Sequence, residues 1–304
     1  LNAYFLLSCT YFTMNTTDAE LPYAVVFGTI MSIGFPLNAI AIWILLRHHS
    51  LKSPNVIFML NLAIADLLLA CSLPLKVYFY ATGVWPLGYT ACIGVRVLFH
   101  VNICTSSIFI TFISVDRVLA VVYPLRSLHI RTARNAVKAV ILAWLLLIII
   151  AILRCIEFGE HLKHYNKYSC FEYRLYADNP RSDPVKIFQL ILVLVLLVVN
   201  VVSTVLVFLT LRRNVKDLPK VNNRVNVMLL FVMSLIMFII CFLPKTIGSF
   251  IKGHDTMYLK CICIAATNCC LDPVLYYFSL DAFWKKKEES KPAQTRAMIR
   301  HQRH

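Results

Sequence analysis

Seven long apolar runs constrain the fold of this chain more than any other feature of its sequence. Each run is long enough to cross the hydrocarbon core of a bilayer, which takes about 20 helical residues. The runs lie at about residues 22–46, 55–80, 90–123, 134–154, 185–211, 225–250 and 257–280. The sequence therefore predicts an all-α membrane protein, a bundle of seven transmembrane helices without a soluble domain.

The amounts of apolar and charged residues agree with a membrane protein. Hydrophobic residues make up 59% of the 304 residues and charged residues only 15%, which lies far outside the usage of soluble globular chains. The formal net charge of +15 is also typical of proteins that bind nucleic acid. The positions of the basic residues, just beyond the apolar runs, favour a membrane surface instead, and we expect no nucleic-acid partner.

The distribution of Lys and Arg predicts how the chain is oriented. Four segments are rich in Lys and Arg, whereas residues 1–22 contain neither. These basic segments are Arg47 to Lys52, Arg126 to Lys138, Arg212 to Arg224 and Lys285 to Arg303. By the positive-inside rule they are cytoplasmic, and the N-terminus is extracellular. An odd number of spans places the C-terminus on the cytoplasmic side as well.

The two ends of the chain carry further signals. Asn15 begins the N-glycosylation triplet Asn-Thr-Thr, which fits an extracellular tail. Leu1 is not a methionine, so we expect the natural chain to start upstream, and residues 1–14 do not have the pattern of a signal peptide. Phe283 and Trp284 precede a lysine run, a pattern typical of a short amphipathic helix on the inner leaflet. The expected domains are an extracellular tail at 1–21, the membrane domain at 22–280, and a cytoplasmic amphipathic helix with a basic tail at 281–304.

The third run, from Cys92 to Pro124, has chemically distinctive residues at both ends. Cys92 stands near its start and the pair Asp116 and Arg117 near its end. Cys92 and Arg117 are 25 residues apart, roughly 37 Å along a helix at 1.5 Å per residue, so they lie at opposite faces of a membrane.

This run resembles the third transmembrane helix of rhodopsin-like (class A) G-protein-coupled receptors. In that family the cysteine tethers an extracellular loop and an Asp-Arg-Tyr motif faces the G protein. Here the third position is Val118, a departure from the motif. The family often restrains the arginine with an acidic residue of the sixth helix. In this chain that position is Arg224, so the resemblance implies that only Asp116 holds Arg117 and that basal signalling is raised.

Other spans carry further motifs of the same family. Asn38 matches the asparagine of the first helix and Asp66 the sodium-binding aspartate of the second. Cys241-Phe242-Leu243-Pro244 resembles Cys-Trp-x-Pro of the sixth helix, and Asp272-Pro273-Val274-Leu275-Tyr276 matches the motif of the seventh. The fifth span lacks the family's proline and tyrosine and has only isolated polar residues at Asn200, Ser203 and Thr204. The usual activation contacts of that helix are therefore not expected.

The resemblance implies roles for residues at these positions. It implies a disulfide bond between Cys92 and Cys170. A second bond, between Cys9 and either Cys261 or Cys263, is a weaker expectation from the cysteine positions. It implies an allosteric sodium site formed by Asp66, Ser106, Asn268 and Asp272, and no cofactor is expected besides this ion. A protonated, hydrogen-bonded carboxyl pair remains the alternative. It implies coupling to a heterotrimeric G protein through Asp116, Arg117, Leu125, Phe242, Pro244, Pro273 and Tyr276.

The ligand is indicated by positive charges inside apolar helices, near the predicted extracellular side. These residues are Lys76, Arg96, His100, Arg154, Lys245 and Lys252. Each long cation alone could reach the lipid headgroups, but several converging on one vestibule require anions. We therefore expect an acidic extracellular ligand, a lysophospholipid above all. The outer half of the chain resembles the purinergic-related receptors for lysophosphatidic acid, lysophosphatidylinositol and small acids. Receptors of that branch for nucleotides, small organic acids or a tethered peptide remain open.

Other classes of membrane protein fit the sequence less well. A transporter is expected to show paired broken helices in two halves, and no such symmetry is visible. A retinal protein needs a lysine within the last helix, whereas Lys260 lies at its outer edge. The sequence shows no combination of nucleophile, base and oxyanion donors, so we do not expect an enzyme. A multi-pass receptor of the plasma membrane is the function that the sequence predicts.

Overall fold

A computed structural model of the chain describes residues 21–162, 170–171, 184–213, 221–251 and 255–276. Every regular element in these ranges is a helix, and seven helical spans are long and apolar enough to cross a membrane. The single-helix spans are α2 (Leu21–His48), α3 (Pro54–Thr82), α4 (Gly88–Val121), α5 (Ala133–Leu162) and α6 (Pro184–Arg213). The sixth span joins α7 (Val221–Ile236), the π-helical segment η3 (Met237–Phe242) and α8 (Leu243–Gly248). The seventh joins α9 (Asp255–Ala266) to a helix over 268–276. The predicted seven-helix bundle is confirmed.

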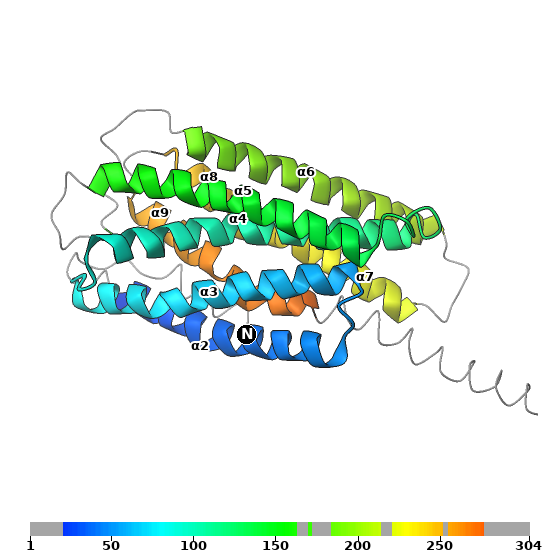
Figure 1. Cartoon of the computed structure of the whole chain (residues 1–304), viewed down its shortest axis with the longest axis horizontal. Coiled ribbons are helices and arrows are strands. Elements are labelled where there is room, and N and C mark those ends of the chain that lie inside the picture. The colour runs from blue at the N-terminus through cyan, green and yellow to red at the C-terminus, as the bar shows by residue number, and fades with distance from the viewer. Residues whose placement is uncertain (1–20, 163–169, 172–183, 214–220, 252–254, 277–304) are drawn as a thin grey trace, which may run out of the picture.

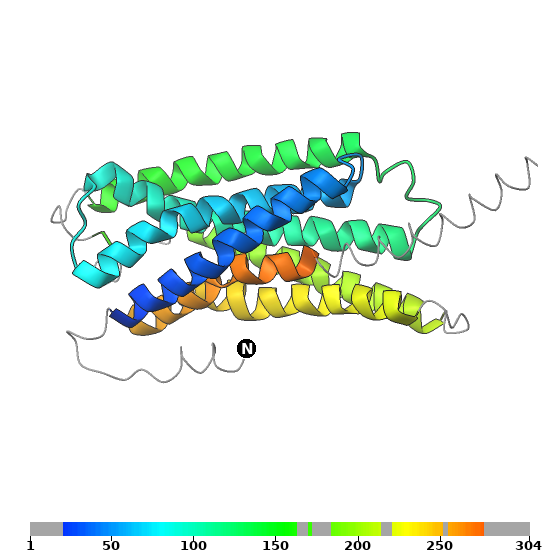
Figure 2. The same ribbon diagram turned by 90° about the horizontal axis from the view of Figure 1, so that it is seen from below.

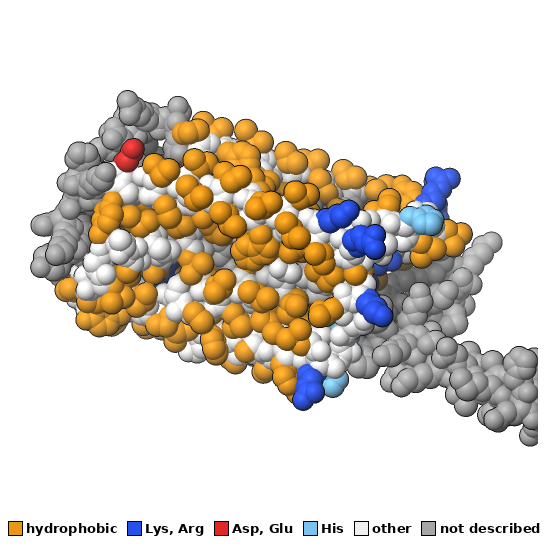
Figure 3. Space-filling view, viewed as in Figure 1, with side chains coloured by type: hydrophobic (Ala, Val, Ile, Leu, Met, Phe, Trp, Pro, Cys, Tyr) orange, Lys and Arg blue, Asp and Glu red, His pale blue; other side chains and the backbone are white. Residues whose placement is uncertain are grey.

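The helices run along the long axis of the molecule, so the bundle has two ends (Figure 1). We call them the disulfide end, where Cys92 and Cys170 meet, and the basic end, where Arg47, Lys52 and Arg131 lie. Figure 2 shows that α2 crosses α9 obliquely on one side of the bundle. In Figure 3 hydrophobic side chains cover the flank, and Lys and Arg side chains gather at the basic end. This arrangement is what a bilayer requires, with apolar atoms at the level of the lipid tails.

Helix α4 lies at the centre of the bundle. In an apolar 18-residue segment of α4, 78% is buried inside the structure, whereas the share is 22% for the corresponding segments of α2 and α6. It contacts α3, α5, α6, α7 and η3. Its polar side chains explain this position, because Asn102, Ser106 and Thr111 need partners that lipid cannot supply. Helices α5 and α6 instead expose aliphatic residues such as Leu142 and Val198.

Helix α2 packs closely against the seventh span. A β-carbon on Gly34 would lie only 2.9 Å from Cys269 Sγ, so the backbones can approach because this residue is glycine. Asn38 Nδ2 donates to the carbonyl oxygens of Cys269, at 2.7 Å, and Gly34, at 3.0 Å. Asn38 therefore faces the bundle and forms its hydrogen bonds within it.

Two spans are irregular near mid-membrane. Pro244 has no N–H group and cannot continue the hydrogen-bond ladder of the sixth span. The turn before it is π-helical, and Leu243 N–H donates to Phe238 O, five residues back. The seventh span is interrupted at Thr267. The sequence showed Pro244 but did not predict the π-helical turn or the break at Thr267.

Two expectations about element boundaries have different outcomes. The fourth span was expected to end at Arg154, but α5 continues for two further turns to Leu162. Arg154 therefore lies inside the helix, and it is only 1% exposed. The predicted amphipathic eighth helix, the N-terminal tail and Asn15 lie outside the described residues.

Candidate functional site

The disulfide end is closed by the predicted bond between Cys92 and Cys170, which is confirmed, with the two α-carbons 5.6 Å apart. The bond fixes residues 170–171 over the start of α4, where Phe171 packs edge-on against Trp85 and Phe79. Cys9, for which a second bond to Cys261 or Cys263 was expected more weakly, lies outside the described residues.

Lys76 is held inside a cage of aromatic rings. Its Nζ lies 3.7 Å from the ring centre of Phe99, 5.1 Å from that of Phe27 and 5.6 Å from that of Phe171. These distances allow cation–π attraction. The side chain is 2% exposed, so Lys76 does not reach toward the headgroups. The sequence did not predict this cage, because its rings come from α2, α4 and the segment after α5.

Arg96 and His100 lie on one face of α4, as their spacing of four residues predicts. Arg96 Nη1 donates to Cys170 O at 2.9 Å, and its guanidinium lies 4.7 Å from the ring centre of Phe158. The ring of His100 packs against the same Phe158, and His100 Nδ1 lies 2.9 Å from Arg96 O. The two residues thus join the disulfide to α5.

Arg154 connects α5 to α6. Its Nη1 donates to Glu157 Oε2 at 2.6 Å and its Nη2 to Gln189 Oε1 at 3.1 Å. Glu157 and Gln189 were not singled out from the sequence. Glu157 stands one helical turn after Arg154, a spacing that would have indicated the ion pair had the helix been extended past Arg154.

Lys245 follows Pro244 and is 1% exposed. Within the described part of the chain its Nζ forms no ion pair and no hydrogen bond. Lys245 is close enough to Arg154, Lys76 and Glu157 for their charges to interact. His100 is close enough to interact in the same way with Lys245, Arg154 and Arg96. We call the five residues Lys76, Arg96, His100, Arg154 and Lys245 the cation cluster. Lys252, the sixth predicted cation, lies outside the described residues.

A second polar site lies deeper in the bundle and contains all four residues of the predicted sodium set. Asp66 and Asp272 are near enough for their carboxyl groups to interact. Asn268 Nδ2 donates to Ser106 Oγ at 2.9 Å, which joins the seventh span to α4. Asn102 Nδ2 donates to Asp66 Oδ1 at 3.1 Å. Sequence reasoning missed Asn102, although it stands one turn before Ser106 on the same helix face.

Several oxygen atoms of this polar site are buried without a hydrogen-bond partner in the described structure. They are Asp66 Oδ2, both carboxylate oxygens of Asp272, Asn102 Oδ1 and Asn268 Oδ1. Buried oxygens of this kind are costly unless a proton or a cation lies between them. Hard oxygen ligands suit a small alkali or alkaline-earth cation, so the residues present fit a sodium ion.

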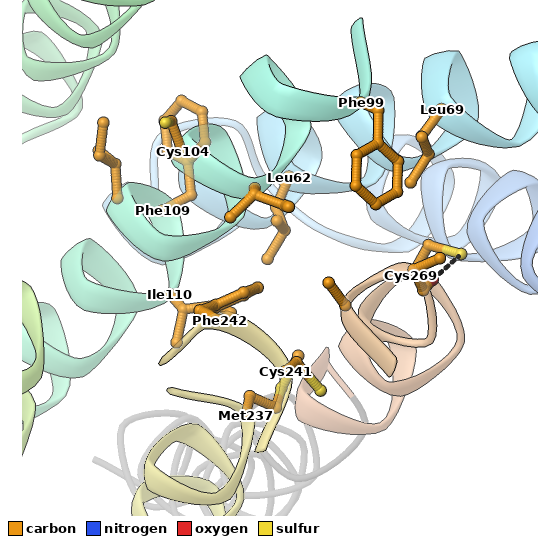
Figure 4. Packing of buried hydrophobic residues seen from close by; sticks show 14 of the residues in the cluster. Leu62, Leu69, Phe99, Cys104, Phe109, Ile110, Met237, Cys241, Phe242 and Cys269 are labelled. Atoms are coloured by element: carbon orange, nitrogen blue, oxygen red, sulfur yellow. Dashed lines mark hydrogen bonds between the residues drawn. The ribbon is translucent and has the colours of Figure 1, made fainter. Parts of the chain in front are cut away.

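The bend of the sixth span lies beside the core of the bundle. Phe242 is fully buried and packs edge-on against Phe238, with ring centres 5.3 Å apart. Figure 4 shows Phe242 and Cys241 among core side chains of α3 and α4 such as Leu62 and Ile110. Pro273 and Tyr276 lie in the helix over 268–276, and the Tyr276 hydroxyl is buried without a hydrogen-bond partner among the described residues.

At the basic end Asp116 has a partner that the sequence did not predict. Both carboxylate oxygens of Asp116 accept hydrogen bonds from Arg131, from Nε at 2.9 Å and from Nη2 at 3.0 Å. Arg131 belongs to the loop after α4 and had not been assigned a role. A forked guanidinium satisfies both oxygens at once, so Asp116 is not reserved for Arg117. In the same loop Leu125 is 81% exposed, which suits a residue expected to contact a partner.

A buried polar network joins α4, α6 and α7, where the sequence predicted only isolated polar residues. Asn200 Nδ2 donates to Thr111 Oγ1 at 2.8 Å, and Ser234 Oγ donates to Asn200 Oδ1 at 2.8 Å. Ser234 Oγ also lies 3.3 Å from Ser114 Oγ. The fifth span therefore contacts its neighbours through Asn200, not through the family's usual tyrosine.

Seven spans, a disulfide-tethered third helix, a polar core and a bent sixth helix define the class of seven-helix membrane receptors. The chain belongs to the rhodopsin family of 7 transmembrane receptors, whose family model matches residues 37–276. Members of this family are receptors that couple to G proteins and are not enzymes, and the chain is a multi-pass protein of the plasma membrane.

Three relatives place the chain in the purinergic-related branch of that family. Lysophosphatidic acid receptor 6 of Mus musculus is 30% identical over 281 residues, which cover 85% of this chain and 80% of the relative. Lysophosphatidic acid receptor 5 of Mus musculus is 31% identical over 289 residues, with 88% and 77% covered. Purinoceptor 8 of Gallus gallus is 29% identical over 276 residues, with 86% and 77% covered.

Proposed function

We propose that this receptor binds an acidic ligand, a lysophospholipid above all, in the cation cluster and transmits its binding to a heterotrimeric G protein. The observation that carries the proposal is the burial of Lys245 with no ion pair or hydrogen bond from the described residues. A cation buried in this way costs several kcal/mol unless an anion approaches it. A ligand phosphate or carboxylate beside Lys245 and Arg154 would supply that anion.

The names of the relatives support this ligand class, since two of the three are lysophosphatidic acid receptors. An acyl chain would find apolar surroundings among the aliphatic side chains of α5 and α6. Nucleotides are the second candidate, because one relative is a purinoceptor. They carry phosphate groups, as lysophospholipids do, but have no acyl chain. Small organic acids and a tethered peptide remain lesser candidates.

The test is a potency measurement in cells with lysophosphatidic acid, nucleoside diphosphates and small carboxylic acids as probes. Lys245→Met and Arg96→Ala should each weaken the active probe by about tenfold or more, the loss of one charge-assisted hydrogen bond. Lys260→Met, which removes a half-buried lysine of α9 outside the cluster, is the matched control. Unchanged potency in both cluster variants, or an agonist that proves cationic, would refute the proposal.

The signalling half of the proposal assigns Arg117 to the G protein, with Leu125 as an apolar contact. The bend at Pro244, with Phe242 beside it, would let α7 swing outward, while Pro273 and Tyr276 adjust in the seventh span. Arg117→Ala should abolish the second-messenger response at matched surface expression. A variant that still couples normally would remove Arg117 from this role.

We also propose that the polar site of Asp66, Asn102, Ser106, Asn268 and Asp272 holds a sodium ion that stabilises the inactive receptor. The buried oxygens without partners support it, and a shared proton is the alternative. Sodium should raise the melting temperature of the purified receptor relative to potassium, and Asp66→Asn should remove the difference. Equal melting temperatures in the two salts would leave the proton as the occupant.

The orientation follows from the same proposal, with the disulfide end and residues 1–21 outside the cell and the basic end facing the G protein. The basic residues of Figure 3 support it. A mobility shift on deglycosylation that disappears in Asn15→Gln would agree, and labelling of the N-terminus only in permeabilised cells would contradict it.

A further inference from the structure

Glu157 places a carboxylate inside the cation cluster. Its Oε2 lies 2.6 Å from Arg154 Nη1, and Glu157 is also within Coulomb range of Lys245. The side chain of Arg154 is 2% exposed and that of Glu157 is 12% exposed. The ion pair is therefore largely shielded from solvent, and Glu157 is the more exposed of its two partners.

An acidic ligand that reaches Arg154 would meet Glu157 already bonded there. Two anions on one buried guanidinium repel each other, so the binding of one weakens the binding of the other. Glu157, which is 12% exposed, is the partner with more access to solvent and would be the one to give way. Arg154 would stay in place, since its Nη2 donates separately to Gln189 of α6.

We propose that Glu157 is an internal competitor of the ligand: its carboxylate occupies Arg154 in the ligand-free receptor and yields it to the ligand's acidic group. The inference rests on the proposed function and adds a rule of selectivity to it. A phosphate monoester carries a charge of about −1.5 to −2 at neutral pH and should displace Glu157 more readily than a carboxylate of charge −1 does. Glu157 therefore favours phosphate-bearing ligands over monoanions.

The first test compares Glu157→Gln with wild type at matched surface expression, with lysophosphatidic acid as the probe. Removing the competitor should lower the half-maximal concentration by about tenfold, equivalent to about 1.4 kcal/mol. Glu160→Gln changes the same charge at an exposed position one turn later and should have no such effect. In an Arg154→Ala background, Glu157→Gln should lose its effect.

The direction of the shift decides between two roles. A weaker response of Glu157→Gln would mean that Glu157 orients Arg154 for the ligand, and an unchanged response that it does not compete; either overturns the inference. If Arg154→Ala weakens the response while Glu157→Gln does not change it, only the inference fails. If Lys245→Met and Arg96→Ala also leave the response unchanged, the proposed function fails with it.

A second test needs no agonist. Glycerol phosphate should stabilise purified Glu157→Gln against heat more than it stabilises wild type, relative to sodium chloride at equal ionic strength, because the variant leaves an anion site open. Glu157→Asp, whose shorter side chain keeps the charge, is the substitute if Glu157→Gln does not fold, and it should give an intermediate shift. Equal stabilisation of variant and wild type would overturn the inference.

Discussion

Arg131 changes the environment of the residues that are expected to switch this receptor. It satisfies both carboxylate oxygens of Asp116 although it is 26% exposed itself. Since Arg224 stands where the family often has an acidic residue, Asp116 is the nearest carboxylate to Arg117 in the sequence. Arg131 therefore competes with Arg117 for the same acid.

Replacing Arg131 should strengthen the electrostatic attraction between Asp116 and Arg117. Without its forked partner, the buried carboxylate of Asp116 has the neighbouring guanidinium as its best remaining cation. We expect Arg131→Gln to lower basal second-messenger production by about two- to fivefold, the range of a partly exposed ion pair. Arg134→Gln, at an exposed position three residues on, is the control for lost charge. Basal production that rises in Arg131→Gln would show that Arg131 restrains the receptor instead.

Single residues also show what the sequence could and could not predict about the sites. Arg96 and His100 follow from helical spacing, and the disulfide and the polar site follow from family motifs. The partners Arg131 and Gln189 do not, because each lies on a different helix or loop from the residue that it binds. Local spacing does not determine how one helix is rotated against the next. Asn102 could have been found, since it stands one turn before Ser106. Glu157 was missed for a different reason, an underestimated helix length.

At the scale of elements, the network of Asn200, Ser234, Thr111 and Ser114 ties the C-terminal end of α7 to α4 and α6. The outward swing of α7 proposed for activation would break both contacts of Ser234. Buried hydrogen bonds contribute about 0.5–1.5 kcal/mol each to stability. The network therefore favours the position of α7 in this structure over one in which α7 has swung outward.

Removing the hydroxyl group of Ser234 should therefore loosen α7. We expect Ser234→Ala to raise basal signalling by about two- to tenfold and to lower the melting temperature of the ligand-free receptor. Thr204→Val is the matched control, because its hydroxyl donates only to Asn200 O of its own helix. Basal signalling equal to wild type at the same surface expression would show that the network does not restrain α7.

Most element boundaries could be predicted because apolar length and basic flanks mark where each helix enters and leaves the membrane. The irregular turns could not. The π-helical turn of Met237–Phe242 and the break at Thr267 depend on which backbone carbonyls are satisfied by other groups, and here Thr267 Oγ1 donates to Ile264 O. These backbone hydrogen bonds depend on how the helices pack together, and not on the local sequence alone.

At the scale of the whole molecule, the two ends carry different chemistry along one axis. The disulfide end buries the cations Lys76, Arg96 and Arg154, and the basic end exposes Lys and Arg side chains (Figure 3). Helix α4 spans both ends, with Cys92 near its start and Asp116 near its end. The polar site of Asp66 and the bend at Pro244 lie between them, where a change at one end can be passed to the other.

The disulfide bond should therefore matter more to the ligand than to the fold. It closes a loop of 78 residues, worth about 4 kcal/mol in the chain-entropy model, but the helices remain held by the bilayer and by one another. Cys170 also presents the carbonyl that Arg96 Nη1 contacts, and the neighbouring Phe171 forms one wall of the Lys76 cage.

The double variant Cys92→Ser with Cys170→Ser should keep its helix content by circular dichroism. It should lose about tenfold or more in potency for lysophosphatidic acid, since Arg96 and Lys76 lose their positions. Cys71→Ser and Cys155→Ser, at exposed cysteines of the flank, are the controls. A double variant with full potency would mean that the loop does not shape the cation cluster, and one without helical signal would mean that the bond is needed for folding itself.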